Sequence, residues 1–164
     1  MGHVLESSFE PVAAFIENGT IKLEKWLIPD PAAVLETGDV VLMVHHGGAG
    51  SFNEGLGSGV PAVVVPFWLD CYDYAVRAEW LGVGIWGTRK SAPVIDGEEL
   101  GMAIIRATGD GEEAVSMREK AGVFKAMVQE RGNGRDVAAK EIVDFMDKLE
   151  GKKNEEEQGL RDEL

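Results

Sequence analysis

The residues best suited to carry chemistry lie in one glycine-rich stretch of the chain. Six of the 21 glycines fall between residues 47 and 60, and this cluster begins directly after His46. Glycines let a backbone approach a ligand closely, and Ser51 adds a hydroxyl near the start of a helix, where backbone N–H groups are free. Such a combination binds phosphate. The sequence therefore predicts an anion site over residues 46–51.

Three familiar glycine motifs do not fit this stretch. A P-loop has a lysine directly after its glycines, and no Lys or Arg occurs from residue 26 to residue 76. The dinucleotide fingerprint has a third glycine where this chain has Asn53, and the nucleophile elbow has a glycine where it has Ala49. A diphosphate can still be held by backbone amides, the helix dipole, a hydroxyl and a histidine, without lysine and without a metal.

The elements that must position this stretch alternate between strands and helices. A half-buried strand is predicted over residues 21–27, and continuous apolar runs predict buried strands over 40–44, 62–65 and 83–86. Helices are predicted over 31–36, 51–56, 70–81, 96–108, 112–131 and 136–149. This alternation predicts a parallel α/β sheet with right-handed crossovers. The glycine stretch then follows a buried strand at its carboxyl end, where open α/β sheets bind ligands.

Composition limits the class of protein and its partners. The 164 residues suit one domain, predicted over 1–150, followed by an acidic, disordered tail over 151–164. A net charge of −13 argues against nucleic acid and anionic membranes as partners. We expect a cytoplasmic protein with no membrane span, because no apolar run approaches about 18 residues. The single Cys71 excludes an internal disulfide and argues against a thiolate zinc site.

The pattern as a whole resembles a known family. It consists of His46-x-Gly48-x-x-Ser51-x-x-Glu54, then Gly59-Val60-Pro61, then Pro66-x-x-x-Asp70. This pattern resembles the donor-sugar signature of UDP-glycosyltransferases, and the surrounding residues resemble fungal UDP-glucosyl/glucuronosyltransferases. The resemblance covers residues 26–89. It implies a partial Rossmann-like parallel sheet flanked by helices, similar to the C-terminal domain of a GT-B glycosyltransferase.

The resemblance implies a role for each matching residue. The group expected to hold the diphosphate of a UDP-sugar consists of His46, Gly48, Gly50 and Ser51. Glu54 would accept hydrogen bonds from the ribose hydroxyls, and Asp70 from hydroxyls of the sugar. Trp26 would provide a platform for the uracil ring. Cys71 stands where plant members have glutamine, so its contact with the sugar would be weaker.

The function implied is transfer of a hexose from a UDP-sugar to an acceptor hydroxyl, with inversion. Family members carry the catalytic base, a histidine, in an N-terminal acceptor domain, so no catalytic residue is expected in this chain. The first strand of the donor domain, which lies beside the strand predicted over 40–44, is also unmatched. The chain is therefore interpreted either as a truncated product or as a half-enzyme completed by a separate acceptor-domain chain. No cofactor and no metal are expected.

The residues leave several alternatives open. Asp70 also fits the N-cap of the helix after it, Cys71 fits a small buried side chain, and His45 fits a packed structural residue. At the level of function, the alternative is a non-catalytic UDP-sugar-binding or interaction module. A third possibility is an unrelated α/β protein whose glycine loop binds another phosphate. That protein would show no preference for UDP over ADP.

Overall fold

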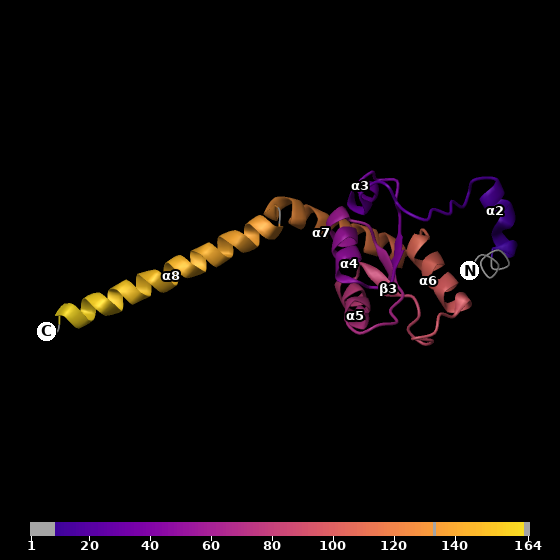
Figure 1. Ribbon diagram of the computed structural model, residues 1–164. Coiled ribbons are helices and arrows are strands. Elements are labelled where there is room, and N and C mark those ends of the chain that lie inside the picture. The colour runs from indigo at the N-terminus through magenta and orange to yellow at the C-terminus, as the bar shows by residue number, and fades with distance from the viewer. Residues whose placement is uncertain (1–8, 133, 163–164) are drawn as a thin grey trace.

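A three-stranded parallel sheet forms the centre of the protein. The computed structural model describes residues 9–132 and 134–162. Strands β1 (Met43–His45), β2 (Ala62–Val64) and β3 (Gly84–Trp86) lie side by side in that order (Figure 1). The register places Val44 beside Val63 and Val63 beside Ile85. The predicted α/β architecture with a parallel sheet is confirmed.

Helices cover both faces of the sheet. On one face, Ala62 and Val64 pack with residues of α4 (Ala49–Ser58) and α5 (Cys71–Leu81). On the other face, Val63 packs with residues of α6 (Gly97–Thr108) and α7 (Glu112–Arg131). Successive side chains of a strand point to opposite faces, so the continuous apolar run of β2 supplies both cores. Burial on both faces explains why this strand is predictable from sequence.

The segment before β1 differs from the prediction. It contains a short 3-10 helix η1 (Glu10–Val12) and helices α2 (Ala13–Glu17) and α3 (Pro31–Leu35). The strand predicted over 21–27 is wrong: these residues are irregular and largely exposed. An alternating pattern forms a strand only where a neighbouring strand accepts its hydrogen bonds, and no described strand pairs with it. Helix α3 is as predicted, and the Asp30 carboxylate accepts the N–H of Ala32 at 2.9 Å.

Strand β1 lies at an edge of the sheet. Within the described residues, β1 pairs with β2 on one side, and no strand pairs with it on the other. The side chains of Val41 and Val44 are 59% and 47% exposed. The edge of the sheet at β1 therefore presents apolar surface to solvent.

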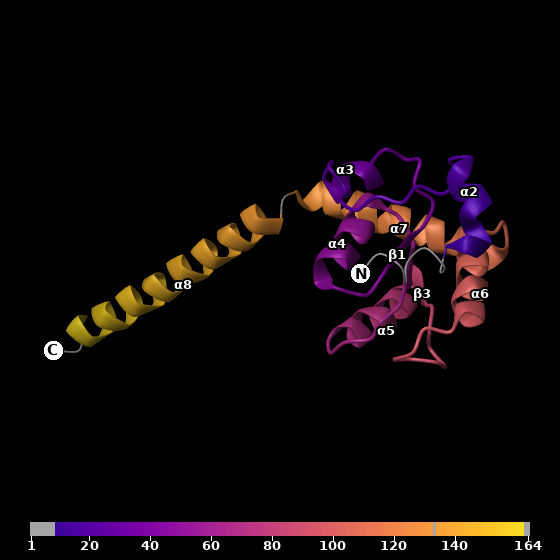
Figure 2. The ribbon, with the colours of Figure 1, turned by 45° about the vertical axis from the view of Figure 1, so that its right-hand side comes forward.

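The C-terminal helix α8 (Gly134–Asp162) extends away from the rest of the chain in both views (Figures 1 and 2). It continues past residue 149, so the segment predicted to be a disordered tail is helical through residue 162. Lysine, glutamate and glutamine, which fill this segment, favour helix in the absence of packing. None of the described helices is long and apolar enough to cross a membrane.

Candidate functional site

The glycine stretch forms the turn between β1 and α4. Gly48 is the N-cap of α4 and provides no side-chain hydrogen bond, and the first helical bond runs from the N–H of Phe52 to the Gly48 carbonyl at 3.0 Å. The N–H groups of residues 49–51 therefore have no partner within the helix. These amides and the positive end of the helix dipole point to the same place. The geometry suits an anion.

His46 lies over the start of this helix. A Cβ atom added to Gly48 would lie 2.7 Å from Nε2 of His46, so the imidazole occupies the space that any other residue at position 48 would need. The His46 ring is solvent-exposed, and its centroid lies 6.3 Å from that of Phe67. The imidazole and the helix N-terminus thus converge on one exposed point at the carboxyl end of β1.

Gly47 joins this turn to the one that follows β2. Its φ is +96°, and an added Cβ atom would lie 2.7 Å from the carbonyl oxygen of Cys71. The backbone of the glycine stretch and the backbone at the start of α5 are therefore in direct contact. Cys71 itself is buried, and burial, followed by the negative charge of Asp70, raises the pKa of its thiol. The structure places the Cys71 side chain in the core and its carbonyl against the glycine stretch.

Asp70 occupies the N-cap position of α5 without capping it. Its side chain makes no hydrogen bond to the helix, and its backbone carbonyl accepts the N–H of Asp73 at 3.0 Å. Asp70 is exposed, and the residue that follows it contacts the glycine stretch. The carboxylate is therefore free to accept hydrogen bonds from a ligand that lies beside His46.

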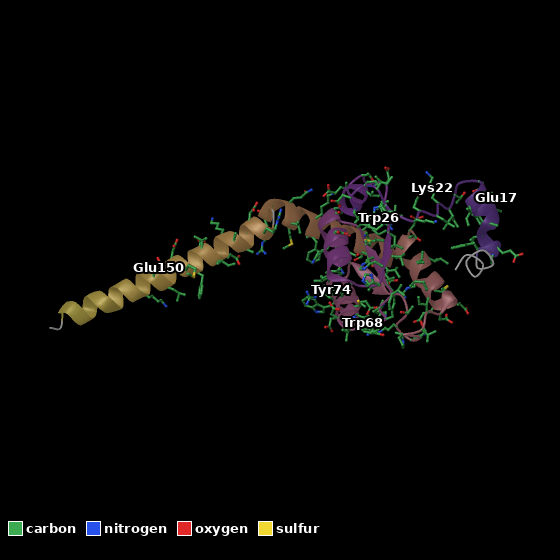
Figure 3. All side chains as sticks on the ribbon, viewed as in Figure 1. Glu17, Lys22, Trp26, Trp68, Tyr74 and Glu150 are labelled. Atoms are coloured by element: carbon green, nitrogen blue, oxygen red, sulfur yellow. The ribbon has the colours of Figure 1, made fainter. Side chains whose placement is uncertain are left out.

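Of the remaining predicted residues, Gly50, Ser51 and Glu54 lie on α4, and Trp26 lies apart. Ser51 and Glu54 are three residues apart, so they share a side of the helix, and both are half-buried. Trp26 is 81% exposed on the irregular connection between α2 and α3 (Figure 3). The structure thus brings the four residues expected to hold a diphosphate together with Asp70 around one turn. Glu54 lies one helical turn further on. The structure gives Trp26 no packing partner among the described aromatic contacts.

The adjacent His45 has a structural role, as the sequence suggested. Its Nδ1 accepts the N–H of Gly47 at 3.0 Å, while its Nε2 is buried without a hydrogen-bond partner. Burial, and secondly the charge of His46, lowers the pKa of His45 below its usual value. His45 therefore fixes the turn as a neutral imidazole. No cluster of three potential metal ligands occurs in the described part of the chain.

Sequence reasoning missed the residues between β2 and Asp70. Phe67, Trp68 and Leu69 are 54%, 64% and 73% exposed, and Leu69 has a φ of +26°. The signal for them was a run of three large apolar side chains directly after Pro66, at a point where neither a strand nor a helix is predicted. Their exposure beside the site depends on the turn geometry, which the sequence pattern does not show.

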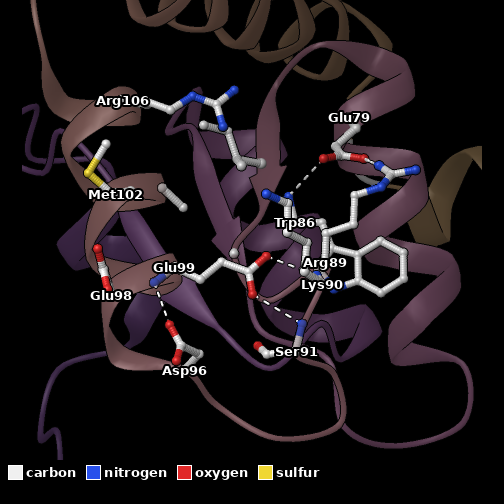
Figure 4. A pocket seen from close by; sticks show the side chains of 13 residues that line it. Glu79, Trp86, Arg89, Lys90, Ser91, Asp96, Glu98, Glu99, Met102 and Arg106 are labelled. Atoms are coloured by element: carbon white, nitrogen blue, oxygen red, sulfur yellow. Dashed lines mark hydrogen bonds and ion pairs between the residues drawn. The ribbon is translucent and has the colours of Figure 1, made fainter.

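Away from this turn, a cavity of about 690 Å³ lies between β3 and α6 (Figure 4). The Glu99 carboxylate there accepts the N–H groups of Lys90 and Ser91 at 2.8 and 3.1 Å, and the Lys90 bond is the main cause of its lowered pKa. Glu79 accepts the N–H of Trp86 and pairs with Arg89. Both carboxylates thus hold the turn after β3, and neither is free to bind a ligand in the way that Asp70 is.

Comparison with known proteins gives consistent results for sequence and fold. Residues 19–140 match the family model described as "Erythromycin biosynthesis protein CIII-like, C-terminal domain". The chain is 38% identical to glycosyltransferase sdnJ of Sordaria araneosa, over 78% of this chain and 28% of that protein. It is 29% identical to erythritol-mannosyl-transferase 1 of Mycosarcoma maydis, over 76% of this chain and 19% of that protein.

A solved structure with a similar fold is that of UDP-glucose: anthocyanidin 3-O-glucosyltransferase in complex with UDP. The TM-score is 0.66 at 23% identity, and the match covers 84% of this chain and 31% of that one. The predicted likeness to GT-B glycosyltransferases is confirmed for the fold. This chain spans less than a third of the length of these relatives.

Proposed function

The chain belongs to the family of erythromycin biosynthesis protein CIII-like C-terminal domains of glycosyltransferases, and from this premise we propose that it binds the donor of a UDP-dependent hexosyltransferase. The observation that carries the proposal is the position of His46 over Gly48, beside the uncapped amides of α4. A diphosphate there would accept hydrogen bonds from those amides and from the Ser51 hydroxyl. No basic side chain is needed, because the helix dipole and a histidine supply the positive potential.

The other predicted residues fit the rest of a UDP-sugar. Glu54 lies one helical turn beyond Ser51 and would accept hydrogen bonds from the ribose hydroxyls. Asp70 would accept them from the hexose, since its carboxylate caps no helix. Cys71 would contribute through its backbone, because its side chain is buried. Trp26 would stack on uracil from its exposed position.

The proposed reaction is an inverting displacement at the anomeric carbon. The acceptor oxygen forms a bond to that carbon, the bond from carbon to the diphosphate oxygen breaks, and UDP leaves. The proton of the acceptor hydroxyl passes to a base that we place on an acceptor domain outside residues 1–164, either in the same protein or in a separate chain. The amides of α4 and His46 stabilise the negative charge that grows on the departing diphosphate. No metal and no cofactor enter this scheme.

Calorimetric titration with UDP tests the donor site. We expect UDP to bind in preference to ADP, and both His46→Ala and Glu54→Ala to weaken binding about tenfold, the effect of removing a hydrogen bond to a charged group. Glu98→Ala is the matched control, since Glu98 is an exposed carboxylate in the first turn of another helix, α6. Equal affinity for UDP and ADP, or unchanged affinity in both site variants, would contradict the assignment.

A non-catalytic UDP-sugar-binding module remains the second candidate, because the proposed base lies outside this chain. Both candidates bind UDP. They differ in turnover: the purified chain, incubated with UDP-glucose and a panel of phenols and sterols, yields no glycoside if it acts only as a binding module. Clear transfer by the chain alone would rule that candidate out.

A further inference from the structure

We propose that His45 is a positioning residue of the donor site: its neutral ring holds the turn that presents His46 and the amides of α4, and protonation of the ring releases the donor. This inference rests on the proposed donor site and adds a means of regulation to it. Acid then weakens donor binding through a side chain that does not itself bind the donor.

The ring of His45 is bonded to the backbone of its neighbour. Its Nδ1 accepts the N–H of Gly47 at 3.0 Å. This N–H belongs to the peptide group that joins His46 to Gly47, so His45 holds the backbone that carries the His46 imidazole. A ring nitrogen that accepts a hydrogen bond carries no proton, which places the proton of the neutral ring on Nε2. The bond to Gly47 therefore exists only while His45 is neutral.

A protonated His45 fits neither its bond nor its place. Both ring nitrogens would then carry a proton, so Nδ1 would point its own N–H at the N–H of Gly47. Nε2 is buried and has no hydrogen-bond partner among the described residues. A buried charge without a partner is costly. Protonation should therefore move the ring out of the turn.

The charged groups around His45 do not compensate such a charge. His45 lies on the same side of β1 as Met43, and a Cβ atom added to Gly55 of α4 would lie 3.6 Å from the Met43 sulfur. This side of the sheet is covered by α4 and α5, whose charged groups, with the N-cap of α5, are Glu54, Asp70, Asp73, Arg77 and Glu79. Burial is the main cause of the lowered pKa of His45, and the one charge that contributes is that of His46, which also lowers it.

Gly47 transmits a movement of His45 to the donor site. Gly47 is buried with a φ of +96°, and a Cβ atom added to it would lie 2.7 Å from the Cys71 carbonyl and 2.9 Å from the Val64 side chain. Gly48, the N-cap of α4, follows directly. When the bond from His45 is lost, the peptide group before Gly47 is free to turn. The His46 imidazole and the amides of residues 49–51 then no longer converge on one point.

A bound diphosphate acts on His45 in two opposite ways. Its negative charge favours the protonated ring, as it would for any nearby histidine. Its contacts with the turn require the neutral ring. The second effect outweighs the first, so donor binding removes a proton from His45. By linkage, a proton on His45 weakens donor binding by the same factor.

The test is an NMR pH titration of the histidine rings and amides of the ¹⁵N-labelled chain, from pH 8 to pH 5, with and without saturating UDP-glucose. The diphosphate of UDP-glucose has no group that titrates in this range. Neutral His45 should show its unprotonated nitrogen at Nδ1. In the free chain, the amides of residues 47–51 should shift together with the His45 ring, and UDP-glucose should lower the pKa of His45 further.

Two substitutions of His45 separate the hydrogen bond from the charge. His45→Leu removes the acceptor and should weaken UDP-glucose about tenfold at pH 7.5 in calorimetry. His45→Asn is the matched conservative variant: its amide oxygen can accept the Gly47 N–H, so it should restore binding, and it cannot be protonated. The affinity of the unmodified chain relative to His45→Asn should then fall as the pH drops, by up to about tenfold per pH unit. His46 is present in both chains, so its own titration cancels in this ratio.

Several outcomes would overturn the proposal. In the free chain, they are amides of residues 47–51 that do not follow the His45 ring. With UDP-glucose, they are a shift of His45 toward its protonated form, or an affinity ratio that stays constant with pH. Equal binding by folded His45→Leu and His45→Asn at pH 7.5 would also do so, and the ratio to His45→Asn decides if His45→Leu does not fold. UDP-glucose that fails to bind the unmodified chain at pH 7.5 overturns the donor assignment as well, whereas binding there with a constant ratio overturns the role of His45 alone.

Discussion

His46 and Gly48 depend on each other at the level of single atoms. The imidazole occupies the space over position 48, and only a residue without Cβ leaves that space open. The pattern His-x-Gly is therefore a packing requirement as well as a match to a family signature. Glycine can matter through its free backbone or through its missing Cβ atom. The backbone at Gly48 has φ −65° and ψ 146°, which any residue can adopt, so only the missing Cβ atom matters here.

Gly48→Ala should therefore weaken ligand binding and leave the fold unchanged. The added methyl group would displace the His46 ring, which is the free end of a side chain and can move at little cost. We expect UDP affinity to fall about tenfold in calorimetry, with little change in thermal stability. Gly97→Ala is the control: Gly97 lies in the first turn of α6 with open space around its Cβ position. A Gly48→Ala variant that binds UDP normally would show that the position of His46 is irrelevant.

His45 predicts a pH dependence of stability. Burial lowers its pKa in the folded chain, so the unfolded chain binds a proton at a higher pH than the folded one does. The stability of the folded chain is then not reduced by His45 at pH values above the unfolded pKa of about 6.5, and it falls as the pH drops below that value. Urea unfolding between pH 7.5 and 5.5 should show this loss. His45→Asn, which keeps an acceptor for the Gly47 N–H, should flatten the slope, and His46→Asn, which removes only the secondary charge effect on His45, should flatten it less. Equal slopes in all three proteins would contradict the assignment.

At the scale of elements, burial of the strands differs sharply across the sheet. Val44 and Val63 are direct neighbours in the register of β1 and β2. Val63 is fully buried, while Val44 is 47% exposed because no described element covers that part of β1. The same residue type in the same ladder therefore contributes very differently to stability.

A matched pair of substitutions measures that difference. Val63→Ala should lower the free energy of unfolding by about 2 kcal/mol, since it leaves a cavity in the core, and Val44→Ala by less than about 1 kcal/mol. Chemical denaturation gives both values. If the two variants lose equal stability, the outer face of β1 is covered in solution, and the exposed edge described above does not exist.

The elements also show what sequence alone can and cannot predict. Helices α3 and α6 were placed correctly because Asp30 and Asp96 each bond to an N–H within three residues, which makes the signal local. The strand predicted over 21–27 failed because strand formation needs a distant partner. The glycine stretch of the site was predictable because its signal is also local in the sequence. The exposure of Leu69 was not, because it depends on a turn packed between two parts of the chain.

At the scale of the whole molecule, α8 stands apart from the body. Apolar side chains along it are about half exposed or more: Ile142, Val143, Phe145, Met146 and Leu149. Figures 1 and 2 show the helix running away from the sheet and its covering helices. The length of the chain therefore overstates the size of its folded core.

Removing α8 should accordingly leave the body intact. A chain ending at residue 132 should keep the urea midpoint of the full chain while losing helical signal in circular dichroism. The control truncation ends at residue 111 and also removes α7, which contributes Ala114, Met117 and Ala121 to the buried interior. That chain should not fold. A lower urea midpoint for the chain that ends at residue 132 would show that α8 packs on the body in solution.

On the proposed function, the uncapped start of α4 would make the stability of the protein depend on its ligand. Gly48 offers no side chain to satisfy the amides of residues 49–51, so on the proposed function the nucleotide completes the hydrogen bonding of the helix. Binding and folding are then linked: nucleotide at a hundredfold excess over its dissociation constant adds about 2.7 kcal/mol to the folded state. Hydrogen exchange should slow first at these amides. The supply of UDP-sugar in a cell would thus regulate how much of this chain is folded as well as how much of it is occupied.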